Sequence, residues 1–240
     1  SAFHWLSLAT HAVNAVLVYL ILFLCLQNHL ASFFGALLFA LHPLQVESVS
    51  YIAAYEFVLG AFFALIAIWQ YLQFSANRDA YGRDRKKPLR HFYVATIAFA
   101  CGLLTLPSAF VAAPMALVME RLLPRRGSSL MGSRHSPMPL VLWAVMSVPV
   151  IIIAARAQDT AALASSLAFW TKPFVAADAL SFYLSKLVAP VFIGPDFGRS
   201  PTFLTKHWWG LMTWILPVCL GLALMYWRGK SSQWYSRAFA

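Results

Sequence analysis

Apolar residues occur along the chain in long runs that are separated by short polar segments. The runs cover residues 3–26, 30–42, 51–74, 92–106, 108–123, 139–155, 176–193 and 207–227. A helix that crosses a membrane needs about 20 mostly apolar residues, and several of these runs reach that length. The pattern therefore predicts an all-α, polytopic transmembrane helical bundle with about seven or eight membrane segments.

Composition supports a membrane protein and leaves little material for a separate soluble domain. The chain is 61% hydrophobic and only 11% charged, with a mean hydropathy of +0.69. Soluble domains carry about 25% charged residues. We therefore predict that residues 1–240 form a single integral-membrane domain. The first run lacks a basic leader and is interrupted by His11 and Asn14, so we expect no cleavable signal peptide.

Basic residues collect in two of the segments between the runs, 75–91 and 121–138. These segments hold Arg78, Arg83, Arg85, Lys86, Lys87, Arg90, Arg121, Arg125, Arg126 and Arg134, against Asp79 and Asp84. An excess of Lys and Arg in short loops marks the cytoplasmic side. We predict that both segments are cytoplasmic loops and that segments 43–50 and 156–175 are extracytoplasmic. The net charge of +10 then reflects topology and contact with anionic lipids, and we expect no nucleic-acid partner.

Proline and charged residues modify two of the runs. If both basic loops are cytoplasmic, 92–123 must leave that side and return to it. Pro107 then predicts a Pro-broken pair of short helices, because proline removes a helix hydrogen bond. The run 176–193 contains Asp178 and Lys186, and we interpret it as an interfacial or re-entrant helix. Arg228, Lys230 and Arg237 favour a cytoplasmic C-terminus. If 176–193 spans the membrane fully, either the C-terminus lies outside or 160–171 also enters the membrane, and both orientations stay open.

Polar residues stand between two apolar runs in the segment from His42 to Tyr51. Ionisable groups are costly to hold in a membrane and usually face a cavity, a partner or a substrate. His42 and Glu47 are therefore the candidate catalytic residues, with Glu47 as a base or metal ligand and His42 orienting it. The alternative is a helix cap, in which Glu47 bonds free backbone N–H groups at a helix start.

No spacing typical of a metal or redox centre accompanies these residues. Cys25, Cys101 and Cys219 each lie inside an apolar run, and we expect them to be small core residues. The histidines show no ligand spacing, and no haem or iron–sulfur pattern occurs. We expect no metal and no cofactor.

The segment from His42 to Tyr51 also resembles part of a known family. It is similar to the segment after the third membrane helix of C-type (GT-C fold) polytopic membrane glycosyltransferases, in the branch that often carries tetratricopeptide repeats. The matching residues are His42, Pro43, Glu47, Ser48, Val49, Tyr51 and Ile52, and further similar segments are 10–15, 35–41, 103–107 and 179–190. The resemblance implies a GT-C scaffold and, in active members, sugar transfer from lipid-phosphate donors.

Charged motif residues of that family are replaced in this chain. The family typically has Arg-Lys-Asp where this chain has Tyr55, Glu56 and Phe57, and a Lys before proline where this chain has Leu106. The resemblance implies that the family's cations hold the donor phosphate, which needs Arg or Lys for a charge-assisted bond. We also expect the chain to begin at the family's second helix, without the first loop that bears the catalytic acid, and we expect no tetratricopeptide repeats.

Two functional hypotheses follow. In the first, the chain is an integral-membrane protein on a degenerate GT-C-like scaffold, a non-catalytic structural or accessory subunit of a larger assembly in the bacterial inner membrane. Its partners would be membrane lipids and other membrane protein subunits. In the second, it is a fragment or split half of an active glycosyltransferase that uses a polyprenyl-phosphate-linked sugar. Arg156 and Lys186 are then candidates for binding lipid or phosphate beside Glu47, and the alternative is that Arg156 and Lys172 snorkel at an interface.

Overall fold

The computed structural model describes residues 2–78, 86–121, 138–157, 171–190, 212–223 and 226. Within these residues every regular element is a helix and there is no strand, so the all-α prediction is confirmed. The chain divides into two compact units, Ser1–Gln158 and Asp159–Ala240. That residues 1–240 form a single integral-membrane domain stays a prediction.

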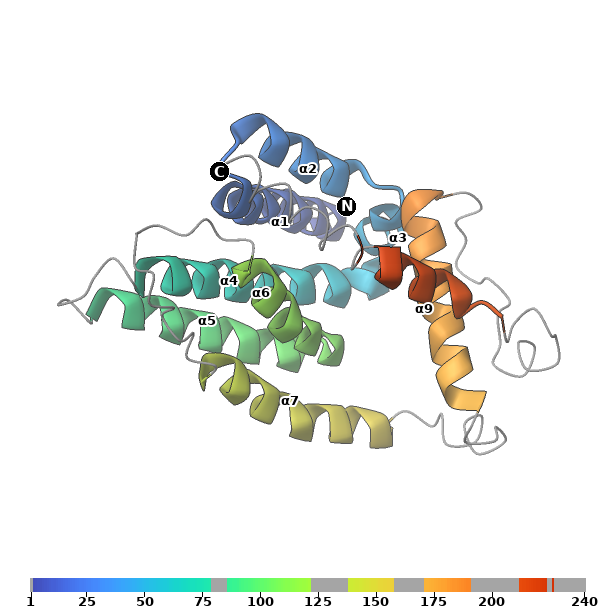
Figure 1. The fold of residues 1–240 in the computed structure, drawn as a ribbon. Helices are drawn as coiled ribbons and strands as arrows, with labels where there is room; N and C mark the ends of the chain where they lie inside the picture. Colours follow the sequence, from blue (N-terminus) through green and yellow to red (C-terminus); the bar gives the residue numbers. More distant parts are fainter. Residues whose placement is uncertain are drawn as a thin grey trace, which may run out of the picture. The chain divides into compact units, whose positions relative to one another are not determined.

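The first unit is built around one central helix. Its elements are α1 (Ala2–Leu26), α2 (His29–Leu41), α3 (Leu44–Ser50), η1 (Ile52–Ala54), α4 (Tyr55–Arg78), α5 (Lys86–Thr105), η2 (Pro107–Val111), α6 (Ala112–Glu120) and α7 (Met138–Ala157). The central α4 packs against α1 on one side and α5 on the other (Figure 1). Helix α2 packs against α1, α7 packs against α5, and α6 packs against α4.

Local sequence explains where these helices end. Gln27 adopts a left-handed conformation with φ of 53°, and its side-chain amide donates to the carbonyls of Phe23 and Leu24, which closes α1. The Asn28 side chain then accepts the backbone N–H of Ala31 and caps α2. Leu106 is extended and Pro107 begins η2, so the predicted break in 92–123 is present.

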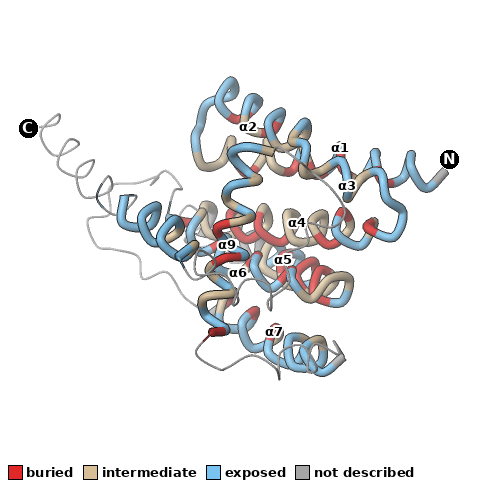
Figure 2. The backbone as a smooth tube through the Cα atoms, turned by 90° about the vertical axis from the view of Figure 1, so that its right-hand side faces the viewer, coloured by how far each residue is buried: buried red, intermediate tan, exposed pale blue. Residues whose placement is uncertain are grey.

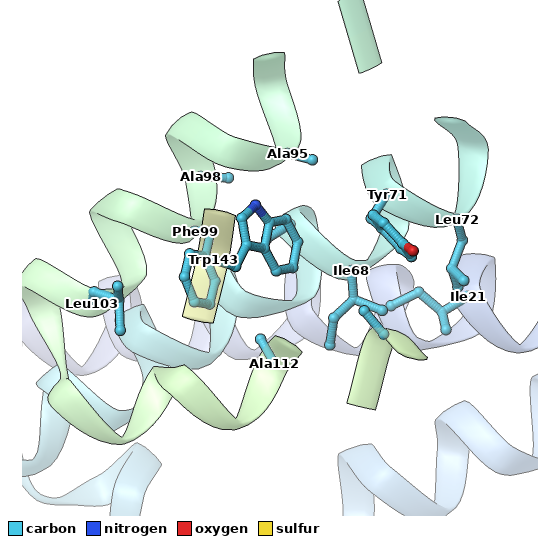
Figure 3. Packing of buried hydrophobic residues seen from close by; sticks show 12 residues of the cluster. Ile21, Ile68, Tyr71, Leu72, Ala95, Ala98, Phe99, Leu103, Ala112 and Trp143 are labelled. Atoms are coloured by element: carbon cyan, nitrogen blue, oxygen red, sulfur yellow. The ribbon is translucent and has the colours of Figure 1, made fainter. Parts of the chain in front are cut away.

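Buried aromatic and aliphatic side chains join α4 to α5 and α7 (Figure 3). The indole of Trp143 stacks on the ring of Phe99 with centroids 4.4 Å apart, and it lies 5.7 Å from the ring of Tyr71. The Trp143 indole N–H donates to the hydroxyl of Thr96. Burial is concentrated on α4 and α5, whereas α2 and α7 expose much of their outer surface (Figure 2).

Three helices are long and apolar enough to cross a membrane, namely Phe3–Leu26, Ile52–Ala76 and Pro139–Arg156. A fourth candidate is the pair His29–Leu41 and Leu44–Ser50, which is bent by 60°. Among the described residues the candidate spans therefore number three, or up to four, fewer than the seven or eight segments predicted.

Helix length accounts for much of this difference. Leu89–Thr105 and Pro107–Glu120 are apolar but shorter than the roughly 20 residues that a span requires, because Pro107 divides the run. Part of the run 207–227 lies outside the described residues, as do parts of the predicted loops 75–91, 121–138 and 156–175. The sidedness of these loops stays a prediction.

The second unit contains α9 (Lys172–Val188) and a helical segment at 215–223. The Ser181 hydroxyl lies 2.6 Å from the carbonyl oxygen of Thr213 and 2.8 Å from that of Ala177, so it ties α9 to the start of the later segment. Asp178 and Ser181 are buried on one side of α9. The predicted interfacial or re-entrant placement of 176–193 stays a prediction.

Candidate functional site

Four polar side chains form a row along one face of α1. Ser7, Thr10, His11 and Asn14 follow the spacing that places residues on one helix face, and all but Thr10 are buried. We call this set the α1 polar row. Polar groups that lie between apolar helices need hydrogen-bond partners, because none can come from lipid.

Three of the four side chains in the α1 polar row are hydrogen-bonded to neighbouring helices. The Asn14 amide donates to the backbone carbonyl of Val58 on α4 at 3.0 Å, and the Thr10 hydroxyl lies 3.3 Å from that of Tyr55. The ring of His11 stacks on Phe39 of α2. Ser7 Oγ and Asn14 Oδ1 are buried with no partner among the described residues. The row therefore acts mainly as a set of polar links between helices.

Two histidines lie at the break between α2 and α3. His11 Nε2 is 3.1 Å from the backbone oxygen of Ala40, a carbonyl in the last turn of α2 that has no helical donor of its own. His42 Nδ1 is 3.2 Å from the backbone nitrogen of Leu44, at the start of α3. One histidine thus bonds the end of α2, and the other bonds the beginning of α3.

Glu47 makes no hydrogen bond to the imidazole of His42, although both residues are described. Glu47 lies in the first turn of α3 with an exposed side chain. His42 directs Nδ1 to the Leu44 N–H instead. Glu56 likewise begins α4 and is exposed. First-turn carboxylates stabilise helix N-termini, so the positions of Glu47 and Glu56 fit the cap interpretation. A catalytic role for Glu47 and His42 stays a prediction.

The two candidate phosphate-binding cations belong to different units of the chain. Arg156 is exposed in the last turn of α7, where a positive charge complements the helix dipole. Lys186 lies in the last turn of α9, with its ammonium 5.5 Å from the centroid of the Phe182 ring. No ion pair joins Arg156 to Glu47, both of which are described. A phosphate site made from Glu47, Arg156 and Lys186 stays a prediction.

The positions where the family carries charged residues have packing roles here. The hydroxyl of Tyr55 meets Thr10 of the α1 polar row, and the ring of Phe57 is exposed. Leu106 lies against Gly60 of α4. None of these three side chains offers a positive charge to a phosphate group.

Sequence reasoning missed the buried carboxylate of Glu120, the last residue of α6. It accepts a hydrogen bond from Tyr71 at 2.9 Å and one from Ser75 at 2.6 Å, both on α4. The three residues therefore fasten the end of α6 to α4. Glu120 directly precedes the basic segment 121–138, but no local signal pairs it with residues more than 40 positions earlier.

Among the described residues, no group of three or more His, Cys, Asp or Glu side chains is arranged to hold a metal ion. No family model, curated protein or solved structure matches the chain. The resemblance to GT-C glycosyltransferases therefore rests on the sequence segments quoted above, and membership of that family stays a prediction.

Proposed function

We propose that this chain is a non-catalytic integral-membrane protein on a degenerate GT-C-like scaffold, which serves as a structural or accessory subunit of a larger membrane assembly. We place it in the bacterial inner membrane, with the basic loops on the cytoplasmic side. Its seven or eight membrane segments include helices that are shorter than the roughly 20 residues of a full span. Its partners are membrane lipids and other membrane protein subunits.

The observation that carries this proposal is the hydrogen bond that His42 makes to the backbone of α3. Its Nδ1 accepts the N–H of Leu44 and so serves the start of α3 rather than the carboxylate of Glu47. No hydrogen bond joins His42 to the Glu47 carboxylate, both of which are described, so His42 does not orient Glu47 as the third group of a catalytic constellation would. The polar residues of this region thus serve to hold helices together.

Exposed apolar surface supports a role inside a membrane assembly. Helix α7 exposes Val145, Val148 and Ile153, and α2 exposes Leu30, Phe34 and Leu41. Such faces are stable only against lipid or another apolar surface. The replacement of the family's cations by Tyr55, Phe57 and Leu106 supports a scaffold without phosphate binding.

One observation favours a second candidate function, a fragment or split half of an active glycosyltransferase that uses a polyprenyl-phosphate-linked sugar. The Glu47 side chain is exposed on α3 with no partner among the described residues, so its carboxylate is accessible to a substrate. Under that alternative Glu47 would bind or activate a substrate group, and another chain would supply the catalytic acid.

A reconstitution experiment tests whether the chain has glycosyltransferase activity of its own. The purified chain is placed in liposomes that contain a polyprenyl-phosphate-linked sugar, and release of polyprenyl phosphate is measured by mass spectrometry. Glu47→Gln is compared with Glu56→Gln, a matched exposed carboxylate in another first turn. We expect no release above protein-free liposomes in any sample. Release that is lost only in Glu47→Gln would overturn the non-catalytic proposal.

Co-assembly is measured in parallel, because an inactive chain need not be a subunit. The tagged chain is extracted in a mild detergent and its complexes are analysed by native mass spectrometry. We expect a defined complex with other membrane proteins at fixed stoichiometry, unchanged by Glu47→Gln. A chain that is found only as a monomer with bound lipid would contradict the subunit role.

A further inference from the structure

The junction between α2 and α3 is held by two histidines with opposite protonation requirements. His11 Nε2 faces the carbonyl oxygen of Ala40, which can only accept, so Nε2 must carry a proton. His42 Nδ1 faces the N–H of Leu44, which can only donate, so Nδ1 must carry none. His42 is therefore the neutral tautomer with its proton on Nε2.

Protonation affects these two bonds differently. An imidazolium ion has two N–H donors and no acceptor. A second proton on His11 leaves its bond to Ala40 in place, whereas a second proton on His42 abolishes the bond from Leu44. Histidine is the side chain whose charge ordinarily changes between about pH 5 and 8.

We propose that the α2–α3 junction is a pH-responsive hinge, in which neutral His42 holds the first turn of α3 and protonation of His42 releases it. The His11–Ala40 bond keeps the end of α2 fixed to α1 in both states, so movement is confined to α3. The hinge changes the 60° bend between α2 and α3 and the position of Glu47, which α3 carries.

Helix α3 depends on this bond more than a longer helix would. It has seven residues, none of which is buried, and Pro43 at its N-cap makes no side-chain capping bond. A helix this short has little stability of its own. Apart from the bond to His42, its first turn is held by the backbone bonds from Gln45 to His42 and from Val46 to Pro43.

The titratable groups around the junction come from a few elements. Helix α3 packs against α1, η1 and α4. Helix α3 itself carries Glu47, and Tyr51 lies between α3 and η1. The titratable residues of the other two helices are His4, His11, Tyr19 and Cys25 on α1 and Tyr55, Glu56, Tyr71 and Arg78 on α4. The hydroxyl of Tyr55 lies 3.3 Å from that of Thr10. His4 is exposed on the first turn of α1 and provides the control for histidine titration elsewhere.

Hydrogen–deuterium exchange of the full chain in lipid nanodiscs, at pH 7.5 and 5.5, tests the hinge. Amide exchange rates for residues 44–47 are divided into the intrinsic rates at the same pH, and the ratio is the protection factor. We expect protection of the wild-type segment to fall about five-fold at pH 5.5, the fold-change that corresponds to the loss of a typical capping bond. Residues 67–72 in the core of α4 should keep their protection at both pH values, which separates local opening from unfolding.

Variants assign the effect to the His42 side chain. His42→Asn keeps an acceptor that reaches the N–H two residues on and does not titrate, so its protection should be the same at both pH values. His42→Ala should show low protection at both, and His4→Gln should respond as the wild type does. Equal wild-type protection at pH 7.5 and 5.5 would overturn the proposal, as would a wild-type response in His42→Asn.

Discussion

Leu106 lies so close to Gly60 that α4 has no space for a side chain at that position. A Cβ atom built on Gly60 would stand 2.8 Å from the Cβ of Leu106 and 3.1 Å from its Cδ2. Gly60 is buried in α4, and Leu106 is the extended residue between α5 and η2. The glycine therefore allows the Pro107 break to pack directly onto the central helix, as small residues do between membrane helices.

Gly60→Ala should destabilise the first unit by about 1–3 kcal/mol, because the new methyl group meets a Cβ atom that cannot move without its backbone. Thermal unfolding in detergent measures the effect. Gly221→Ala is the matched control, since it places a methyl group in a helix with nothing within 4 Å. A double-mutant cycle with Leu106→Gly, which removes the clashing Cβ atom, should show that the two changes are coupled. Equal unfolding temperatures for Gly60→Ala and the wild type would contradict the close approach.

Loss of the Glu120 carboxylate should weaken the attachment of α6 to α4. Glu120→Ala removes the carboxylate to which the hydroxyls of Tyr71 and Ser75 donate, which should cost about 1–3 kcal/mol. Tyr71→Phe should cost less, and a double-mutant cycle of the two changes should show coupling. Tyr93→Phe, at an exposed position of α5, should have little effect on the unfolding temperature. Additive effects of Tyr71→Phe and Glu120→Ala would contradict a direct interaction.

The helices themselves were largely predictable, because their limits depend on local features. The apolar run 3–26 corresponds to α1, and 139–155 corresponds to α7 within two residues at each end. The break before Pro107 followed from the chemistry of proline alone. The number of full membrane spans was not predictable in the same way. An apolar run does not show whether the helices it forms are long enough to cross a membrane.

The candidate site was less predictable, because its bonds depend on which helices become neighbours. The sequence drew attention to His42 and Glu47 but left two roles open, and only the position of the Leu44 N–H shows what His42 Nδ1 bonds. The bond from Asn14 to Val58 joins residues 44 positions apart. Sequence periodicity identifies polar positions on a helix face, whereas packing decides their partners.

Trp143 should be the most sensitive aromatic position of the core. It is fully buried, stacked on Phe99, and bonded through its indole N–H to Thr96. Trp143→Ala should therefore cost about 3–5 kcal/mol, whereas Trp143→Phe keeps a ring on Phe99 and should cost less. Thermal unfolding provides the measurement, with Trp214→Phe at an exposed position as the control. Equal losses for the Ala and Phe variants would mean that ring stacking contributes nothing.

Asn14 offers a test of whether the α1 polar row serves only to link helices. Asn14→Leu removes the bond to the Val58 carbonyl, which remains in a continuous helix, and also removes the unpartnered Oδ1 atom. Links of this kind contribute about 0.6 kcal/mol on average, so the unfolding temperature should change little. Asn14→Asp should destabilise by about 3–5 kcal/mol, because it places an uncompensated charge at a site that is 1% exposed.

Asn14→Ala separates the effect of lost volume from that of the lost bond, since it removes the amide without filling its space. A loss in Asn14→Leu as large as that in Asn14→Asp would contradict the linking role. It would mean that Oδ1 accepts a hydrogen bond from a bound water or ligand between α1 and α4, because only a satisfied polar atom is costly to replace with an apolar group of similar size.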